Sequence, residues 1–241
     1  MPKGFVIPVH FYNQHMEQAG LWPLVEKMLA NKEFQGDLQV RYDTLTVLRE
    51  AIFAADIDPV FLQMVKNKMN LEYPGERCRF RSSTNAEDIS GFNGAGLYTS
   101  KSGDPNDDDY PVEDAIRTVW ASLWNFRAYE ERAYFSIPHT DIGMALLVHH
   151  SFADEDANGV AITANIYDTT GLEPGFYVNV QEGGESVVLP EAGNTTDQFI
   201  YYYNLPGQPI VFMGHSNLIP EGETVLTTSE TYKLGKALDA I

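Results

Sequence analysis

Residues 81–98 read RSSTNAEDISGFNGAGLY, and this stretch decides how the rest of the sequence is interpreted. It begins with Arg81 and carries glycines at 91, 94 and 96. Glycine has no Cβ and tolerates positive φ, so a glycine-rich loop can turn tightly and bring its backbone close to a ligand. Successive backbone N–H groups can bind an anion, and an arginine adds a planar fork of donors suited to phosphate. The stretch is typical of a phosphate-binding loop, with an ordinary turn between two strands as the open alternative.

Four further blocks accompany this loop. They are PKGFVIP at 2–8, VWASLWNFRAY at 119–129 with a following Arg132, NGVAIT at 158–163, and NVQEGGESVV at 179–188. Together with RSSTNAED and GFNGAGLY, they resemble, in the same order, the nucleotide-binding domain of the pyruvate phosphate dikinase and phosphoenolpyruvate synthase family. Glucan water dikinases share this domain. Because the blocks span residues 2 to 188, the resemblance is more specific than any single motif.

The expected fold class is α+β. The first 70 residues have helical patterns, and Asp58-Pro59 is a good helix start because an N-cap residue precedes a proline. A long helix is predicted from Pro111 to about Phe135, and a final helix from Thr228. Short strands are predicted at 77–83, 144–149, 159–164, 176–180, 186–189, 199–203 and 209–213. Helices followed by strands, with little βαβ alternation, argue against a doubly wound sheet.

The resemblance implies a fold in more detail. The family has an ATP-grasp fold, in which two lobes clamp a nucleotide. We therefore expect a partial ATP-grasp-like domain with a first lobe at 1–150, which holds the helices and the Arg81 loop. A second lobe at 151–241 would be rich in mainly antiparallel strands.

The composition excludes several classes of partner. The chain has 241 residues, of which 34 are acidic and 16 basic, for a net charge of −18. Such a surface repels polyanions, which argues against nucleic-acid and anionic-membrane binding. No apolar run approaches the ~18–20 residues that span a bilayer. The single cysteine, Cys78, is expected to be a small core residue in a protein of a reducing, cytoplasmic compartment.

The sequence predicts no metal site of its own. Neither GxxxxGK[ST] nor GxGxxG occurs, which excludes a P-loop. Asp104, Asn106 and Asp108 alternate as in a calcium loop, but Asp109 stands where that loop needs glycine. The segment from Lys101 to Tyr110 is therefore expected to be a mobile surface loop that is unrelated to calcium.

Seven residues are expected to contact the nucleotide. The resemblance implies this role for Arg81, His149, Thr163 and Glu185, with Arg81 expected as the main phosphate contact and the one catalytic residue. Arg127, Gly94 and Gly96 are added from their own chemistry, because a second cation and the amides of a glycine loop suit phosphates. Backbone amides at the two glycines would cover the phosphates, and His149 matches a family residue near the adenine.

The residues themselves leave plainer alternatives. His149 can equally be a half-buried edge histidine, and Thr163 and Glu185 can be ordinary strand surface. Arg127 can form a helix-face salt bridge with Glu130 or Glu131.

The implied activity is that of an ATP-dependent phosphotransferase. ATP, with Mg²⁺ in the complete enzyme, would phosphorylate a histidine on a separate domain, and that domain would pass the group to an acceptor such as pyruvate or a glucan. The family's Gly-Gly-Lys segment and its C-terminal segment have no counterpart here, so we expect the isolated chain to be inactive and to bind ATP weakly or not at all. The alternative is a non-catalytic interaction module that kept the fold and lost the chemistry. Nothing in the sequence indicates the final acceptor.

Overall fold

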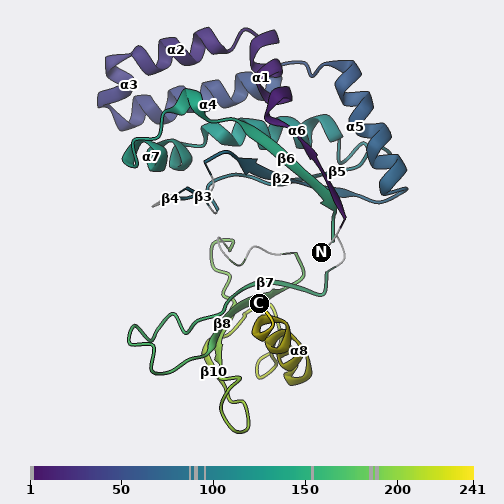
Figure 1. Ribbon diagram of the computed structural model, residues 1–241, viewed down its shortest axis with the longest axis vertical. Coiled ribbons are helices and arrows are strands. Elements are labelled where there is room, and N and C mark those ends of the chain that lie inside the picture. The colour runs from purple at the N-terminus through teal and green to yellow at the C-terminus, as the bar shows by residue number, and fades with distance from the viewer. Residues whose placement is uncertain are drawn as a thin grey trace. The chain divides into compact units, whose positions relative to one another are not determined.

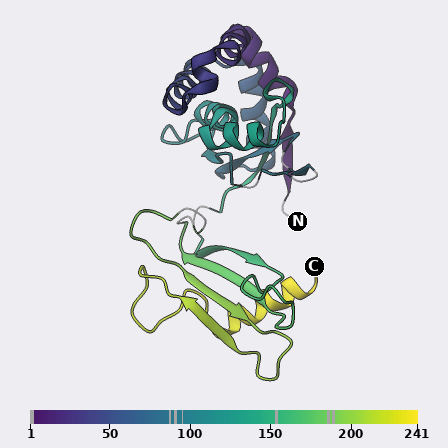
Figure 2. The same cartoon turned by 90° about the vertical axis from the view of Figure 1, so that its left-hand side faces the viewer.

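The computed structural model describes residues 3–86, 88–89, 92–94, 96–152, 155–184, 187 and 190–241, with only the backbone at 88–89 and 92–93. The chain divides into two compact units, Met1–Ser151 and Phe152–Ile241, which we call unit 1 and unit 2 (Figures 1 and 2). Helices dominate unit 1, and antiparallel sheets occur in both units, so the α+β class is confirmed.

Unit 1 combines a helical layer with one sheet. Its helices are α1 (Val9–Gln18), α2 (Trp22–Ala30), α3 (Lys32–Gly36), α4 (Leu38–Ala54), α5 (Pro59–Glu72), α6 (Val112–Ala121) and α7 (Phe126–Tyr134), with 3₁₀ turns η1 (Ser122–Trp124) and η2 (His139–Asp141). The sheet has the order β1-β6-β2-β5, formed by β1 (Gly4–Ile7), β6 (Met144–His150), β2 (Cys78–Thr84) and β5 (Lys101–Gly103). A separate hairpin pairs β3 (Asp88–Ile89) with β4 (Phe92–Asn93).

The expected start of α5 is confirmed, because the Asp58 side chain accepts hydrogen bonds from the N–H groups of Val60 and Phe61. In contrast, the single helix predicted from Pro111 to Phe135 is wrong. It is broken at Asn125, which has an extended backbone with φ −56° and ψ 138°. The break lets the Trp124 indole turn into the core, where its Nε1 donates to the Tyr12 hydroxyl at 3.0 Å. Periodicity alone cannot detect such a break, since the apolar pattern continues through it.

The sheet of unit 1 has two chemically different faces. Side chains alternate between the faces of a strand. In β2, Cys78 and Phe80 are fully buried in the core formed with the helices, whereas Arg79 and Arg81 are exposed. In Figure 1 the labelled helices of this unit gather on one side of the sheet. The face turned away from these helices is called the open face below.

Unit 2 is a four-stranded antiparallel sheet with one helix. The order is β10-β9-β8-β7, formed by β10 (Ile210–Gly214), β9 (Asp197–Tyr201), β8 (Phe176–Glu182) and β7 (Ala157–Ile162). Helix α8 (Thr228–Asp239) begins with a capping box between Thr227 and Glu230. It packs closely, because a Cβ at Gly235 would lie 2.2 Å from the Tyr201 ring. The strand predicted at 186–189 lies outside the described residues, except for Val187.

Candidate functional site

The open face of unit 1 carries polar and apolar groups side by side. Antiparallel register places Arg81 opposite Leu147, and Leu147 opposite Val6 of β1. Val6 is 59% exposed and Leu147 is 38% exposed. Residues directly opposite on one face of an antiparallel pair have Cβ atoms about 4.5–5.5 Å apart. The three side chains therefore form one row that ends in a guanidinium.

A second row runs beside the first on the same face. Arg79 lies opposite His149 and, on its other side, opposite Ser102 of β5. The Arg79 Nη1 donates to the Ser102 hydroxyl at 3.3 Å. The two arginines are two residues apart on one strand, so both positive charges point to the same face.

Arg81 differs from Arg79 in its bonding. It is exposed, and no described residue forms an ion pair or side-chain hydrogen bond with its guanidinium. A guanidinium offers five N–H donors and remains charged in proteins. The open face thus presents the N–H donors of Arg81 beside the apolar side chains of Leu147 and Val6. This combination suits a ligand in which an anionic group is attached to an apolar ring.

The first end of the glycine loop is fixed by Asn85. Its Nδ2 donates to the carbonyl of Asp141 at 2.8 Å, and its Oδ1 accepts from the Gly143 N–H at 3.0 Å. The side-chain amide thus uses both its donor and its acceptor in hydrogen bonds to backbone groups in or next to η2. Asn85 therefore fastens the end of β2 to the segment that leads into β6.

The second end of the loop is a tight turn. The Leu97 N–H donates to the Gly94 carbonyl at 3.2 Å, and Gly96 has φ +75°. This backbone conformation favours glycine, since a Cβ would be strained there. The described structure thus gives a reason for glycine at 96, whereas Gly94 is buried without positive φ. Their predicted contact with phosphates stays a prediction.

The end of the loop packs on the second family-like block. The Asn125 Nδ2 donates to the Leu97 carbonyl at 3.1 Å, and Leu97 packs with the buried Ala128. The Arg132 Nη1 donates to the Tyr98 hydroxyl at 3.3 Å. Two sequence blocks that were recognised separately are therefore one packed structure.

Arg127 is not part of this packing. It is exposed at the start of α7, and its expected alternative, a salt bridge with Glu130 or Glu131, does not occur among the described residues. Glu130 instead pairs with Arg41, with Nη1 and Oε1 2.7 Å apart. Arg127 thus keeps its donors for solvent or a ligand.

His149 is half-buried on the open face. Its Nδ1 lies 2.7 Å from the carbonyl oxygen of His150, so in this arrangement Nδ1 carries the proton and donates. Nε2 is then the acceptor of the neutral ring. The structure places this ring in the row that contains Arg79, in agreement with either of the two roles considered for it.

The predicted residues of unit 2 are placed only in part. Thr163 is exposed and directly follows the last residue of β7. Glu185 lies outside the described residues. In the same block, Asn179 and Gln181 are buried, where the first donates to the Val187 carbonyl at 3.0 Å and the second to the Thr195 carbonyl at 2.8 Å. These two amides hold loops against β8, which is a structural role.

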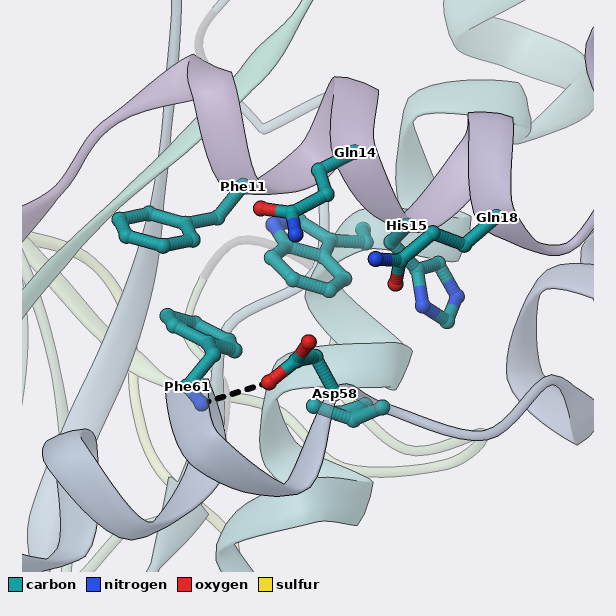
Figure 3. Close-up of a pocket in the computed structure, with 8 residues that line it drawn as sticks. Phe11, Gln14, His15, Gln18, Asp58 and Phe61 are labelled. Atoms are coloured by element: carbon teal, nitrogen blue, oxygen red, sulfur yellow. Dashed lines mark hydrogen bonds between the residues drawn. The ribbon is translucent and has the colours of Figure 1, made fainter.

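A small pocket in unit 1 lies away from all of these residues. Figure 3 shows it between α1 and α5. Its lining residues are Phe11, Gln14, His15, Gln18, Ile57, Asp58, Phe61 and Trp120, and its volume is about 10 Å³. A water needs roughly 10–15 Å³ of such space, so this pocket holds at most a single water and cannot take a nucleotide.

Several residues of the site were missed in the sequence. Arg79, Val6 and Leu147 share the open face with Arg81, and strict alternation along predicted strands could have found Arg79 and Leu147. Asn85 carried no signal, because its partners lie 56 and 58 residues away in the chain. Within the described residues, no group of three or more His, Cys, Asp or Glu side chains could hold a metal ion. No described helix is long and apolar enough to cross a membrane.

Known proteins resemble this chain over most of its length. The family described as pyruvate phosphate dikinase, AMP/ATP-binding domain, matches residues 1–211. The phosphoenolpyruvate synthase of Aquifex aeolicus (strain VF5) is 28% identical over 229 residues, which cover 91% of this chain and 25% of that protein. A probable phosphoenolpyruvate synthase of Staphylothermus marinus is 28% identical over 203 residues, or 78% of this chain and 23% of that protein.

A third relative has a similar degree of identity. The probable phosphoenolpyruvate synthase of Methanothermobacter thermautotrophicus is 25% identical over 234 residues, or 93% of this chain and 33% of that protein. The chain therefore spans a quarter to a third of the length of the curated relatives it matches.

Proposed function

Because the chain belongs to the pyruvate phosphate dikinase AMP/ATP-binding domain family, we propose that it is the ATP-binding portion of a dikinase-type phosphotransferase. In this proposal, bound ATP phosphorylates a histidine on a separate domain. The partners are ATP and the phosphohistidine and acceptor-binding domains of the parent protein.

One observation carries the assignment of the phosphate site. The Arg81 guanidinium is exposed and has no partner among the described residues, and it stands beside the apolar Leu147 and Val6. A triphosphate joined to an aromatic base needs both kinds of surface. A cation held ready at the phosphates contributes most of what a protein supplies in phosphoryl transfer, which is positioning and charge stabilisation.

The remaining roles follow from this assignment. Arg81 contacts the phosphates, and the backbone at Gly94 and Gly96 covers them. Arg127 adds a second cation, and His149 contacts the adenine. We also assign Thr163 and Glu185 nucleotide contacts, as their family counterparts imply. Arg79 adds positive charge to the same face, although its Nη1 donates a hydrogen bond to the Ser102 hydroxyl.

Magnesium is part of the proposal only through ATP. The described residues do not fit a protein-built Mg²⁺ site, because no suitable group of carboxylate or histidine side chains occurs among them. Mg²⁺ commonly keeps several waters and binds substrate phosphates together with one or two carboxylates. We therefore assign it no ligand among these residues.

The transfer itself is written for the histidine acceptor. The β-phosphorus of ATP would form a bond to a ring nitrogen of that histidine, the bond between the α- and β-phosphates would break, and its bridging oxygen would leave with AMP. The γ-phosphate, still attached to the transferred β-phosphate, would then be released by water as inorganic phosphate. The separate domain would then carry the group to the final acceptor, which the residues of this chain do not identify.

Because the isolated chain is expected to bind ATP weakly or not at all, the experiment is a calorimetric titration of the parent protein with ATP, AMP and inorganic tripolyphosphate, each with and without Mg²⁺. We expect ATP to bind more tightly than either fragment, because it engages both the cation and the apolar row. Binding of tripolyphosphate as tight as that of ATP would contradict the apolar row as a base site. Absence of binding by all three ligands would contradict the proposed function for this chain.

A further inference from the structure

Both ends of the glycine loop are fastened to the same short turn, η2. At the first end, Asn85 bonds the backbone of Asp141 and Gly143. At the second end, Tyr98 accepts from Arg132, and the Arg132 Nε donates to Nδ1 of His139 at 3.3 Å. His139 and Asp141 are the two ends of η2. The first end of the loop is therefore bonded to η2 directly, and the second end is connected to η2 through Arg132.

Arg132 is the residue that joins these parts. Its side chain is fully buried. Each of its three nitrogens donates in a different direction, because Nη2 donates to the Leu123 carbonyl at 2.8 Å. A guanidinium is planar and rigid, so these bonds fix η1, Tyr98 and η2 relative to one another. A flexible ammonium could not hold all three in the same geometry.

Filling space in the core does not explain why an arginine, which carries a charge, is buried at position 132. Its three partners are neutral, and no carboxylate forms an ion pair with it among the described residues. Burying a cation is costly unless it is paired and hydrogen-bonded. A buried apolar side chain would fill the same space without that cost, but it could not orient Tyr98 and His139.

The surrounding groups keep the partners in the required state. Arg132 donates to Nδ1 of His139, so that nitrogen must be unprotonated. Burial and the nearby Arg132 charge lower the pKa of His139 to about 4. The His139 ring also stacks on Tyr129, with centroids 3.9 Å apart. The acceptor is therefore neutral at physiological pH and fixed in orientation.

We propose that Arg132 is a positioning residue which, through Tyr98 and His139, holds the described second end of the glycine loop at Gly94, Leu97 and Tyr98 in the position that accepts the ligand, without touching the ligand. The proposal rests on the proposed function, since it names the support of the same phosphate loop. Complete burial of Arg132 and its three internal bonds separate its role from that of the exposed Arg81.

The test changes single side chains of this network in the parent protein. Tyr98→Phe deletes only the accepting hydroxyl, and Arg132→Lys keeps the charge but loses the fork. Tyr134→Phe is the matched control, because Tyr134 is 82% exposed on the same helix as Arg132. ATP affinity is measured by calorimetry, and hydrogen exchange is measured at the Leu97 amide, which bonds Gly94 across the turn.

We expect Tyr98→Phe and Arg132→Lys each to weaken ATP binding about tenfold, the scale of one hydrogen bond to a charged group. The double variant should be no weaker than the worse single variant, because both changes break one connection. Exchange at Leu97 should rise in both variants and stay unchanged in Tyr134→Phe. His139→Asn, which keeps an acceptor, should retain more affinity than His139→Leu.

Two outcomes would overturn the proposal. If Arg132→Lys weakens ATP binding and Tyr98→Phe does not, the bond from Arg132 to Tyr98 does not position the loop. If exchange at Leu97 rises while ATP affinity stays at the wild-type value, the network is only structural. If the parent protein without any of these substitutions binds no ATP, the proposed function fails by itself. The exchange data then decide separately whether Arg132 holds the loop, and unchanged exchange in both variants would reject it.

Discussion

Arg81 of β2 lies directly opposite Leu147 of β6 in the antiparallel register of unit 1. One side chain is a cation without a described partner, and the other is an aliphatic group that is 38% exposed. The pair combines on one sheet face the two requirements of a nucleotide, a counter-charge for phosphate and an apolar surface for a base. The two parts can be tested separately.

In the full-length parent protein, Arg81→Ala should weaken ATP binding about ten- to a hundredfold, because a hydrogen bond to a charged group contributes roughly 1.5–3 kcal/mol. Thermal stability should barely change, since Arg81 is exposed and has no partner among the described residues. Calorimetry gives the affinity, and a thermal melt gives the stability.

Lys27→Ala is the control for this change. It removes one positive charge from an exposed position on α2, so it reports the effect of net charge alone. Equal loss of affinity in Lys27→Ala, or unchanged affinity in Arg81→Ala, would show that Arg81 is not the phosphate contact.

Leu147→Gln should weaken binding of ATP but not of tripolyphosphate. The side chain would lose part of its apolar contact with the base, which at about 25 cal/mol per Å² for a half-exposed leucine corresponds to a roughly fivefold loss. Arg81→Ala, in contrast, should weaken the binding of both ATP and tripolyphosphate. If Leu147→Gln lowers the affinity for both ligands equally, the apolar row does not contact the base.

The class of fold and most of its elements could be predicted because their signals are local. The cap at Asp58 lies next to the proline that begins α5, and β2 and β6 carry the expected strand patterns. The break at Asn125 could not be predicted, because it depends on the contact of Trp124 with Tyr12, 112 residues away. The strand at Gly4–Ile7 was also missed, since a short apolar run has no strand signal of its own until β6 pairs with it.

The candidate site, like the fold, could be predicted only where its signals are local in the sequence. Arg81 and the turn at Gly96 could be named because an arginine, hydroxyls and glycines stand together in one segment. The supports of the loop could not, because Asn85, Arg132 and His139 act over long separations through buried bonds. For Arg127, the expected helix-face partner Glu130 was engaged by Arg41, which the sequence places 89 positions away.

Cys78 should be unreactive in the native protein. It is the single cysteine of the chain and is fully buried, and burial raises the pKa of its thiol to about 12. The thiolate is the reactive form, so both its low population and its burial protect it. A disulfide reagent at pH 8 should label the native protein far more slowly than the protein in denaturant. Equal labelling rates in the two states would mean that β2 opens readily, and the description of a closed core around Cys78 would then be wrong.

His139 should make the stability of unit 1 depend on pH. Its pKa is lowered to about 4 in the folded protein, whereas an unfolded histidine has a pKa of about 6.5. Between these values the unfolded state binds a proton that the native state does not, so stability falls as pH falls from about 6.5 to about 4. Above pH 6.5 both states are neutral and this contribution is constant.

His139→Asn should flatten the dependence of stability on pH between pH 6.5 and 4, as measured by denaturant melts at pH 7, 6, 5 and 4.5. His15, whose pKa burial also lowers, remains in both proteins and therefore cancels in the comparison. His10→Asn, a change at an exposed position of α1, is the control. If the His139→Asn variant shows the same pH dependence as the wild-type chain, the pKa of His139 is not lowered in the folded protein.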